Sequence, residues 1–330
     1  MYFPPSKILN LCRTRVEQVA RHTMDLTMRQ ETSSLITLRA GSMQLSIAPE
    51  AGGSITQFAS EHHGRLFNWM RPASEDALAT RSAGGTSSFP MVPFSNRIRN
   101  GRFLFRGRII QLEQNFSPEP HAIHGHAWRH PWRVVDLSDT SAIIEYQHAA
   151  DSWPWRYRAQ QIFSLSDERL TVRFSVTNES TDDMPVGFGL HPYFVRTAGT
   201  TIRANVGDMW HADNNAMPEA LVAPPEQLLL DGTGLNPDAS PLDNNFVNFG
   251  GQVLIDWPEQ QAQLEINADP IYQCLVVYTP PEQPFFCVEP ATNHIDGFNL
   301  AAEGRDDTGI IVVEPNDTAI GNVTFTPRSV

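Results

Sequence analysis

The stretch YRAQQIFSLSDERLTVRFSVT, residues 157–177, decides the fold class of this chain. Apolar residues recur at every second position on both sides of a polar turn at residues 166–169. The alternating positions are Tyr157, Ala159, Gln161, Phe163 and Leu165 before the turn, of which Gln161 alone is polar, and Leu170, Val172, Phe174 and Val176 after it. A period of two sends successive side chains to opposite faces of a strand. The stretch therefore predicts an antiparallel β-hairpin with one buried face and one face in water.

The same alternation recurs along most of the chain, and long helical periodicity is absent from these parts. Further strands and hairpins are predicted at residues 43–47, 103–112, 134–146, 253–266 and 310–325. The 25 prolines and 21 glycines are scattered between these runs and do not form one linker. We therefore predict an all-β fold, a large antiparallel β-sandwich, in a single domain of residues 34–330.

Two segments depart from this pattern. Residues 1–33 carry four arginines and no signal-type apolar run, which predicts an N-terminal leader that is peripheral or flexible. Residues 210–243 are poor in alternation and rich in Pro, Asn and Asp. They predict a long excursion over the sandwich, where binding residues are often found.

Composition limits the classes of partner. The net charge of −13 argues against nucleic acid or an anionic membrane as the main partner and suits a cytoplasmic enzyme. The three cysteines, Cys12, Cys274 and Cys287, show no metal-ligand spacing and are interpreted as reduced thiols. The sequence has no phosphate-binding glycine loop, no nucleophile elbow and no CxxC pair, so no cofactor is expected. We predict a small-molecule ligand bound by a monomer or homodimer.

Two apolar runs each end in one ionisable residue followed by proline. They are Val186–Phe194, which contains His191, and Phe285–Pro290, which contains Glu289. Because the residue before proline favours extended geometry, both groups are predicted at strand ends. A carboxylate in so apolar a run needs a partner, and the alternative to a function is a structural ion pair with an arginine. The two groups together suggest an acid/base pair.

Other candidate residues are weaker when taken singly. Arg97, beside Asn96, follows an apolar, proline-rich lead-in that could fix the direction of its guanidinium. The run from His121 to His126 permits two readings, a metal site or a hydrogen-bonding role for His124. Asp243, in the excursion, is either a turn former or a ligand contact.

Taken in order, these landmarks resemble the aldose 1-epimerase (galactose mutarotase) family. The matching pieces are Pro49–Gly53, Asn96–Ile98, His124–Gly125, Trp153–Trp155, Gly189–Phe194, Leu242–Asp243 and Val288–Pro290. The resemblance covers nearly the whole chain apart from the leader. It implies a β-sandwich isomerase without metal, a sugar as substrate, His191 as general acid and Glu289 as general base. It also implies sugar binding by Asn96, Arg97, His124 and Asp243.

The resemblance leaves the substrate open. His126 stands where a second glycine is expected, and the strand at residues 274–278 lacks a glutamine that some members use. Galactose is therefore not implied. The alternatives are an epimerase of a phosphorylated or sulfonated sugar, with an anion pocket built by Arg97, Arg99 or Arg129, and a carbohydrate-binding sandwich without turnover. A metal-dependent lyase or isomerase using His121, His124 and His126 is a third reading. Glu289→Gln and His191→Asn are each predicted to abolish most turnover and leave thermal unfolding nearly unchanged.

Overall fold

A computed structural model of the chain describes residues 35–213 and 215–330, and residues 37–330 form one compact unit. The prediction for residues 1–33, and Cys12 with it, lies outside the described residues. The named strands pair with antiparallel neighbours in two large sheets and three small ones. The predicted fold class, an antiparallel β-sandwich, is confirmed. Within the described residues, no helix is long and apolar enough to cross a membrane.

The larger sheet contains eleven strands and carries the candidate site. In spatial order it runs β1 (Ile36–Ala40), β2 (Met43–Ala48), β3 (Ser54–His62), β5 (Ser88–Met91), β15 (Gly189–Val195), β23 (Phe285–Ala291), β22 (Cys274–Tyr278), β19 (Asp243–Phe246), β17 (Met209–Ala212) and β18 (Pro218–Val222). Strand β4 (Arg65–Asn68) pairs with β3. Strands β15 and β23 therefore lie in the interior of the sheet, with neighbours on both sides.

The second sheet contains eight strands. Its order is β10 (Arg133–Leu137), β11 (Ser141–His148), β12 (Tyr157–Leu165), β13 (Leu170–Asn178), β25 (Thr318–Ser329), β21 (Ala262–Ala268), β20 (Gln252–Trp257) and β16 (Thr201–Ala204). The hairpin predicted at residues 157–177 is β12–β13, in an unbroken register from Tyr157 opposite Asn178 to Leu165 opposite Leu170. It occupies the middle of this sheet.

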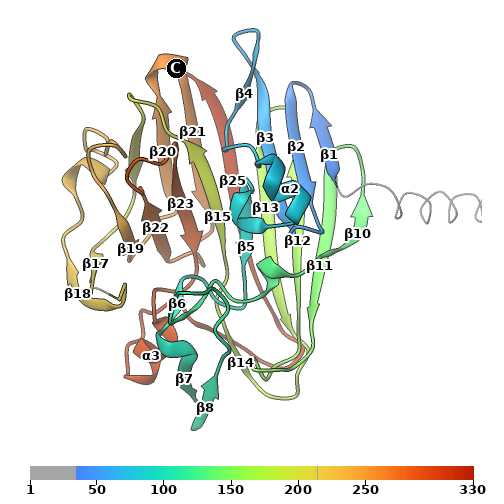
Figure 1. The fold of residues 1–330 in the computed structure, drawn as a ribbon, viewed down its shortest axis with the longest axis vertical. Coiled ribbons are helices and arrows are strands. Elements are labelled where there is room, and N and C mark those ends of the chain that lie inside the picture. Colours follow the sequence, from blue (N-terminus) through green and yellow to red (C-terminus); the bar gives the residue numbers. More distant parts are fainter. Residues whose placement is uncertain (1–34, 214) are drawn as a thin grey trace, which may run out of the picture. The chain divides into compact units, whose positions relative to one another are not determined.

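Short elements complete the fold. The small sheets pair β14 (Met184–Val186) with β24 (Ile311–Val313), β6 (Arg97–Ile98) with β9 (Ala122–Ile123), and β7 (Arg102–Phe105) with β8 (Arg108–Gln111). The helices are α2 (Glu75–Thr80) and α3 (Gly297–Ala302), and the 3-10 turns are η1 (Ala83–Gly85), η2 (Arg99–Gly101), η3 (Ala127–Arg129), η4 (Glu226–Leu228) and η5 (Pro258–Gln260). Strands β6, β7 and β8 gather with α3 at the lower end of Figure 1.

The core between the two large sheets comes from the alternation along each strand. In β15, Leu190 and Phe194 point away from His191, and Phe194 lies 6.5 Å from Trp257 of β20 in the opposite sheet. Both residues are at most 1% exposed. His191 therefore projects from the other face of the larger sheet. That face does not pack against the eight-stranded sheet.

The excursion predicted at residues 210–243 is more regular than expected. It supplies most of β17 and all of β18, which extend the larger sheet at its edge. Trp210 and Met217 are buried against Val247 and Ile295. Sparse alternation hid these strands because they are four and five residues long and a bulge shifts their register. Asp243 is the first residue of β19, so it reaches the site from a strand.

Candidate active site

His191 and Glu289 lie inside their strands. His191 is the third of seven residues in β15, and Glu289 is the fifth of seven in β23. The prediction that both residues lie at strand ends is therefore wrong. Extended geometry before proline is also the geometry of a strand interior, so the proline signal could not separate the two cases.

The register of these two strands brings the acid and the base together. Tyr193 pairs with Cys287, and the same register sets His191 directly across from Glu289. Directly opposite residues in an antiparallel pair share one face of the sheet. The Nε2 atom of His191 lies 3.2 Å from Oε1 of Glu289. Two groups almost one hundred residues apart in sequence thus lie in direct contact.

This pair forms part of the wall of a cavity of about 240 Å³ on the free face of the larger sheet. The six candidate site residues all line it, together with eight others: Gly84, Phe89, Phe116, Ile123, Trp128, Tyr193, Val276 and Tyr278. A ligand pocket commonly combines apolar walls with a few placed polar groups in this way. The structure therefore brings together every residue predicted for the site, while their roles stay predictions.

The imidazole of His191 packs against two aromatic rings that are also neighbours of each other. Its ring centroid lies 4.4 Å from that of Phe89 and 4.7 Å from that of Tyr193, and those two centroids are 6.3 Å apart. Arg71 lies over the ring of Tyr193, with its Cζ 4.0 Å from the ring centroid. This burial lowers the pKa of His191 from 6.5 to about 3, with a smaller contribution from the charge of Arg71.

Burial acts on Glu289 in the opposite direction. The carboxyl is 2% exposed, and its pKa rises well above 4.5 because burial, and then the neighbouring Asp243, disfavour its charge. The separation of 3.2 Å would suit an ion pair, but burial opposes the charge on both partners. Burial therefore favours the form of the free pair in which both groups are neutral and their one shared proton is on Glu289.

Arg97 is aimed into the cavity by its own backbone and by two carboxylates. Asn96 adopts φ 55°, and its side-chain Oδ1 accepts a hydrogen bond from the Arg97 backbone N–H at 2.9 Å. Glu119 Oε2 holds Arg97 Nε at 3.3 Å, and Asp243 Oδ2 lies 3.8 Å from Nη2. The guanidinium is thus fixed in orientation and keeps donors for a bound hydroxyl group.

His124 is a neutral donor to the cavity. Its Nδ1 accepts a hydrogen bond from the backbone N–H of Asn96 at 3.2 Å, which places the proton of the neutral ring on Nε2. Burial, followed by the charges of His191 and Arg97, lowers its pKa well below 6.5. The ring stands edge-on to His191 with centroids 5.2 Å apart. His124 can therefore donate one hydrogen bond close to the acid/base pair.

Gly125 explains how the loop after His124 approaches the sheet. It has φ 66°, and a Cβ atom built on it would lie 2.1 Å from the carbonyl oxygen of Val92. No side chain fits at that distance. The next residue, His126, turns away and bonds the Tyr157 hydroxyl at 2.8 Å. His126 therefore occupies the position of the expected glycine without lining the cavity.

The three histidines of this loop do not converge on one point. His121 Nδ1 accepts the Asn100 backbone N–H at 3.0 Å, while His124 and His126 bond Asn96 and Tyr157. Each ring thus has separate partners, and the histidines of residues 121–126 are not grouped as metal ligands in the described structure. The loop passes through positive φ values at His124 and Gly125, so spacing in sequence does not fix how these rings lie in space.

The proposed anion pocket also lacks two of its members. Arg99 binds Asp296 at 3.1 Å, and Arg129 donates to the Asn115 carbonyl oxygen at 2.6 Å. Neither residue lines the cavity, whose acidic and guanidinium groups are Arg97, Asp243 and Glu289. The one arginine of the cavity wall therefore shares it with two carboxyl groups.

Sequence reasoning missed several residues that shape the site. Tyr193 and Cys287 lie two positions from His191 and Glu289 on the same strand faces, so a period of two was enough to find them. Tyr278 pairs with both Cys287 and Asp243 across neighbouring strands. Phe116 and Glu119 come from a loop with no periodic signal, and no sequence pattern predicted their position.

Asn293 joins the loop after β23 to the segment that carries Arg97. Its Oδ1 accepts from the Ser95 backbone N–H and hydroxyl, each at 2.9 Å, and its Nδ2 donates to the carbonyl oxygens of Ser95 and His294 at 3.1 and 3.0 Å. Asn293 is 1% exposed. Water cannot easily replace it, so it is a positioning residue for Asn96 and Arg97.

Asn293→Ala is expected to lower the free energy of unfolding by about 2–4 kcal/mol, since each buried group left unpaired costs about 1–3 kcal/mol. It should also raise KM more than it lowers kcat, because Arg97 loses its support. Urea unfolding and sugar kinetics measure the two effects. Asn236→Ala is the control, with two hydrogen bonds at the surface where water can substitute. Equal losses in both variants would contradict the assignment.

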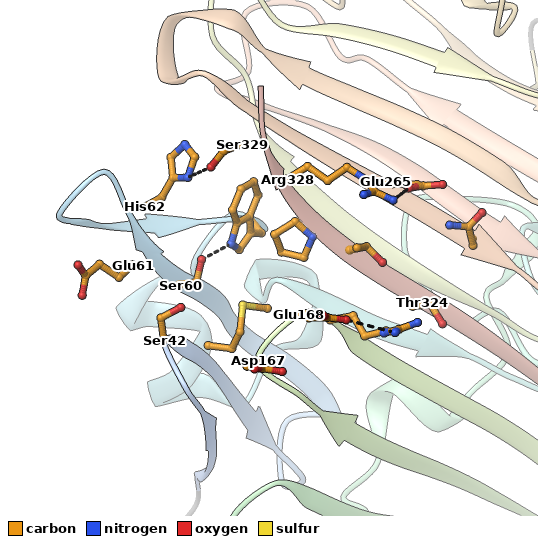
Figure 2. A pocket seen from close by; sticks show the side chains of 16 residues that line it. Ser42, Ser60, Glu61, His62, Asp167, Glu168, Glu265, Thr324, Arg328 and Ser329 are labelled. Carbon is orange, nitrogen blue, oxygen red and sulfur yellow. Dashed lines mark hydrogen bonds and ion pairs between the residues drawn. The ribbon is translucent and has the colours of Figure 1, made fainter.

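A second, larger depression lies away from these residues. It has a volume of about 700 Å³ and lies across β2, β3, β21 and β25, as Figure 2 shows. Its polar groups bond mainly one another: Arg328 Nε binds Glu265 at 2.9 Å, and His62 lies 3.4 Å from the Ser329 hydroxyl. Its one acid with a shifted pKa is Glu265, whose pKa is lowered mainly by the hydrogen bond from Arg328. With these groups already paired, size alone does not make the depression the site.

Comparison with known proteins identifies the family of this chain. Residues 34–325 match the family model described as Aldose 1-epimerase. The uncharacterised protein YphB of Escherichia coli (strain K12) is 29% identical over 302 residues, which cover 88% of this chain and 98% of YphB. YihR of the same organism, also uncharacterised, is 25% identical over 218 residues, covering 63% of this chain and 70% of YihR.

Solved structures show the same fold. One is the crystal structure of a protein from Escherichia coli K12 that is named as an aldose 1-epimerase without an established activity. It superposes on this chain with a TM-score of 0.80 at 27% identity, over 90% of this chain and 99% of that one. A galactose mutarotase-like protein from Clostridium acetobutylicum gives a TM-score of 0.79 at 18% identity, over 90% and 95% of the two chains. The match of the family model over most of the sequence shows that this chain belongs to the aldose 1-epimerase family.

Proposed function

We propose that the protein interconverts the α and β anomers of a neutral aldose, with Glu289 as general base and His191 as general acid. The observation that carries this proposal is the directly opposed pair, 3.2 Å apart, in the wall of a sugar-sized cavity. Mutarotation needs one proton acceptor at the C1 hydroxyl and one proton donor at the ring oxygen. Two coupled groups that share one proton supply both.

The reactive form arises by moving that proton from Glu289 to His191. A C1 hydroxyl that donates to the carboxylate, and the positive charge of Arg97 nearby, both favour the ionised glutamate. Glu289 then takes the C1 proton while His191 protonates the ring oxygen, and the bond from C1 to that oxygen breaks. After rotation about C1–C2, reclosure with the roles reversed gives the other anomer. Each positioned group contributes about 10²–10⁴-fold to the rate.

The remaining polar groups would orient the sugar. Arg97 and the Nε2–H of His124 donate to hydroxyl oxygens, and Asp243 accepts from hydroxyl hydrogens, with Asn96 holding the first two in place. Fixing the ring in this way supplies the positioning part of catalysis. Because Asp243 balances the one arginine of the cavity, and Glu289 adds negative charge whenever it is ionised, a neutral sugar fits the cavity better than a phosphorylated or sulfonated one.

The test is the approach to anomeric equilibrium of freshly dissolved α-glucose, α-galactose and other neutral aldoses, followed by polarimetry or NMR. We expect the protein to accelerate at least one of them, and a chelator not to slow it. Binding of sugars without acceleration would replace the proposal by the carbohydrate-binding alternative. Acceleration confined to phosphorylated or sulfonated sugars would overturn the choice of a neutral substrate. The predicted single domain at residues 34–330, the cytoplasmic location and the monomer or homodimer remain parts of this proposal.

The pH dependence follows from the shared proton. The pair gains a second proton only when His191 is protonated beside a protonated Glu289, and the pKa of His191 is about 3. We therefore expect kcat/KM to stay level as the pH falls from 7.5 to 5, and to decline only as it approaches 3. Polarimetry corrected for the uncatalysed reaction measures this, with circular dichroism to confirm folding. A decline centred near 6.5 would show a histidine with an ordinary pKa.

A further inference from the structure

Cys287 lies beside the proposed acid/base pair but has no part in the proposed reaction. It precedes Glu289 by two residues in β23, so both side chains project from the same face of the strand. Its thiol is free and fully buried. In the cross-strand row next to the pair, it lies between Tyr193 and Tyr278. The sulfur atom of Cys287 therefore lies next to the proposed acid/base pair, on the same face of the sheet.

The three side chains approach the spacing of metal ligands. One ligand atom each from His191, Cys287 and Glu289 lies within 4.8 Å of the other two, and the nitrogen and carboxylate oxygen are 3.2 Å apart. Around tetrahedral zinc, with bonds of about 2.0–2.3 Å, ligand atoms are about 3.3–3.8 Å apart. Closing the remaining gap takes a movement of about 1 Å by a side chain.

We propose that His191, Cys287 and Glu289 form an inhibitory site for a thiophilic divalent cation such as Zn²⁺. Nitrogen, sulfur and carboxylate oxygen are the three donors that zinc prefers, and three protein ligands leave a fourth position for water or a sugar hydroxyl. That fourth position opens towards the cavity, because His191 and Glu289 both line it. The cation is thus an inhibitor that reaches its site through the substrate cavity.

The charge of the cluster favours such an ion despite its burial. Binding of the cation releases the thiol proton of Cys287 and the proton of the His191–Glu289 pair to water. The resulting thiolate and carboxylate carry two negative charges, which balance the two positive charges of the cation. Bringing an unbalanced charge into a buried site is expensive, whereas this group of four is neutral overall. Mg²⁺ and Ca²⁺ prefer six or more oxygen ligands and gain nothing from sulfur. Selection for zinc over these ions follows from the donor set.

The functional consequence rests on the proposed epimerase activity. A bound cation would occupy the lone pair of His191 Nε2 and the carboxylate of Glu289, so neither group could transfer a proton. Inhibition should be reversed by a chelator and should weaken as the sugar concentration rises. The metal site itself does not depend on turnover, so binding and activity can be measured separately.

The experiment combines a binding spectrum with a rate measurement on the full chain. Co²⁺ serves as a spectroscopic substitute for Zn²⁺, and coordination by a thiolate gives a sulfur-to-cobalt charge-transfer band. We expect this band in the wild-type protein, its loss in Cys287→Ala, and its displacement by Zn²⁺. Zn²⁺ should inhibit mutarotation in the wild type, and the concentration for half inhibition should rise about 10–100-fold or more in Cys287→Ala. Mg²⁺ should have no effect.

Cys274→Ala is the matched control. Cys274 is also a fully buried free thiol in the same sheet, where its sulfur accepts a hydrogen bond from Asn245. This variant should keep both the cobalt band and the sensitivity to zinc. Equal inhibition of wild type and Cys287→Ala, or the absence of a thiolate band in the wild type, would overturn the proposal. If the protein accelerates no sugar, the cobalt spectrum still tests the site, and the failure belongs to the proposed function alone.

Discussion

Replacing Glu289 with glutamine should reduce kcat by about 10²–10⁴-fold, the usual contribution of a positioned general base. The amide keeps the shape of the carboxyl and can donate a hydrogen bond to His191, but it cannot accept a proton from the C1 hydroxyl. The structure indicates no loss of stability, because burial raises the pKa of this carboxyl and so opposes its ionised form. We therefore expect the thermal unfolding midpoint to be unchanged or slightly higher. Polarimetry and thermal unfolding monitored by circular dichroism measure the two quantities.

The control for this substitution is Glu145→Gln. Glu145 is also a buried glutamate, 5% exposed, but it lies on β11 of the other sheet. Its oxygens bind Arg133 at 2.8 Å and Gln160 at 2.8 Å, away from the cavity. This variant should lose stability, by about 1–2 kcal/mol, because its charge is used in hydrogen bonds, and it should keep full activity. A stable Glu289→Gln variant with the wild-type rate would remove Glu289 from the mechanism.

The sandwich could be predicted because alternation is a local property. The period of two can be recognised within a single run, such as residues 157–177. An antiparallel hairpin then pairs two strands that follow each other in the sequence. Strands β17 and β18 were not predicted because they are short and a register shift breaks their alternation. Alternation also fixes which residues share a face, so Tyr193 could have been placed beside His191 from sequence alone.

The site could be predicted only in part, because its geometry depends on distant pairings. Nothing in the two runs around His191 and Glu289 states that β15 lies next to β23 or in which register. The resemblance to a family predicted that His191 and Glu289 act together, but it did not give the distance between them. The protonation of the pair could not be read from residue types either. Histidine is usually suited to proton transfer near neutral pH, whereas the rings of Phe89 and Tyr193 bury this one and lower its pKa.

Replacing His191 with asparagine should also reduce kcat by about 10²–10⁴-fold, but with a different effect on stability. The smaller amide cannot take up the proton that the ring oxygen needs, and Glu289 loses the partner that receives its proton. It also removes the ring that packs against Phe89 and Tyr193. Since an aromatic pair contributes about 0.5–1.5 kcal/mol, loss of both stacks should lower the free energy of unfolding by about 1–3 kcal/mol. The sequence alone predicted no such loss.

His148→Asn separates the chemistry of His191 from its burial. His148 is 6% exposed, and its Nε2 bonds the Trp153 carbonyl oxygen at 3.1 Å, outside the cavity. Burial lowers its pKa as well, although a hydrogen bond and the nearby Asp151 act against that shift. This variant should lose stability to a similar degree and retain the rate of the wild type. If His148→Asn and His191→Asn lose activity equally, the effect at His191 is one of folding. If only His191→Asn loses it, while both remain folded at the assay temperature, the proton carried by His191 is required for turnover.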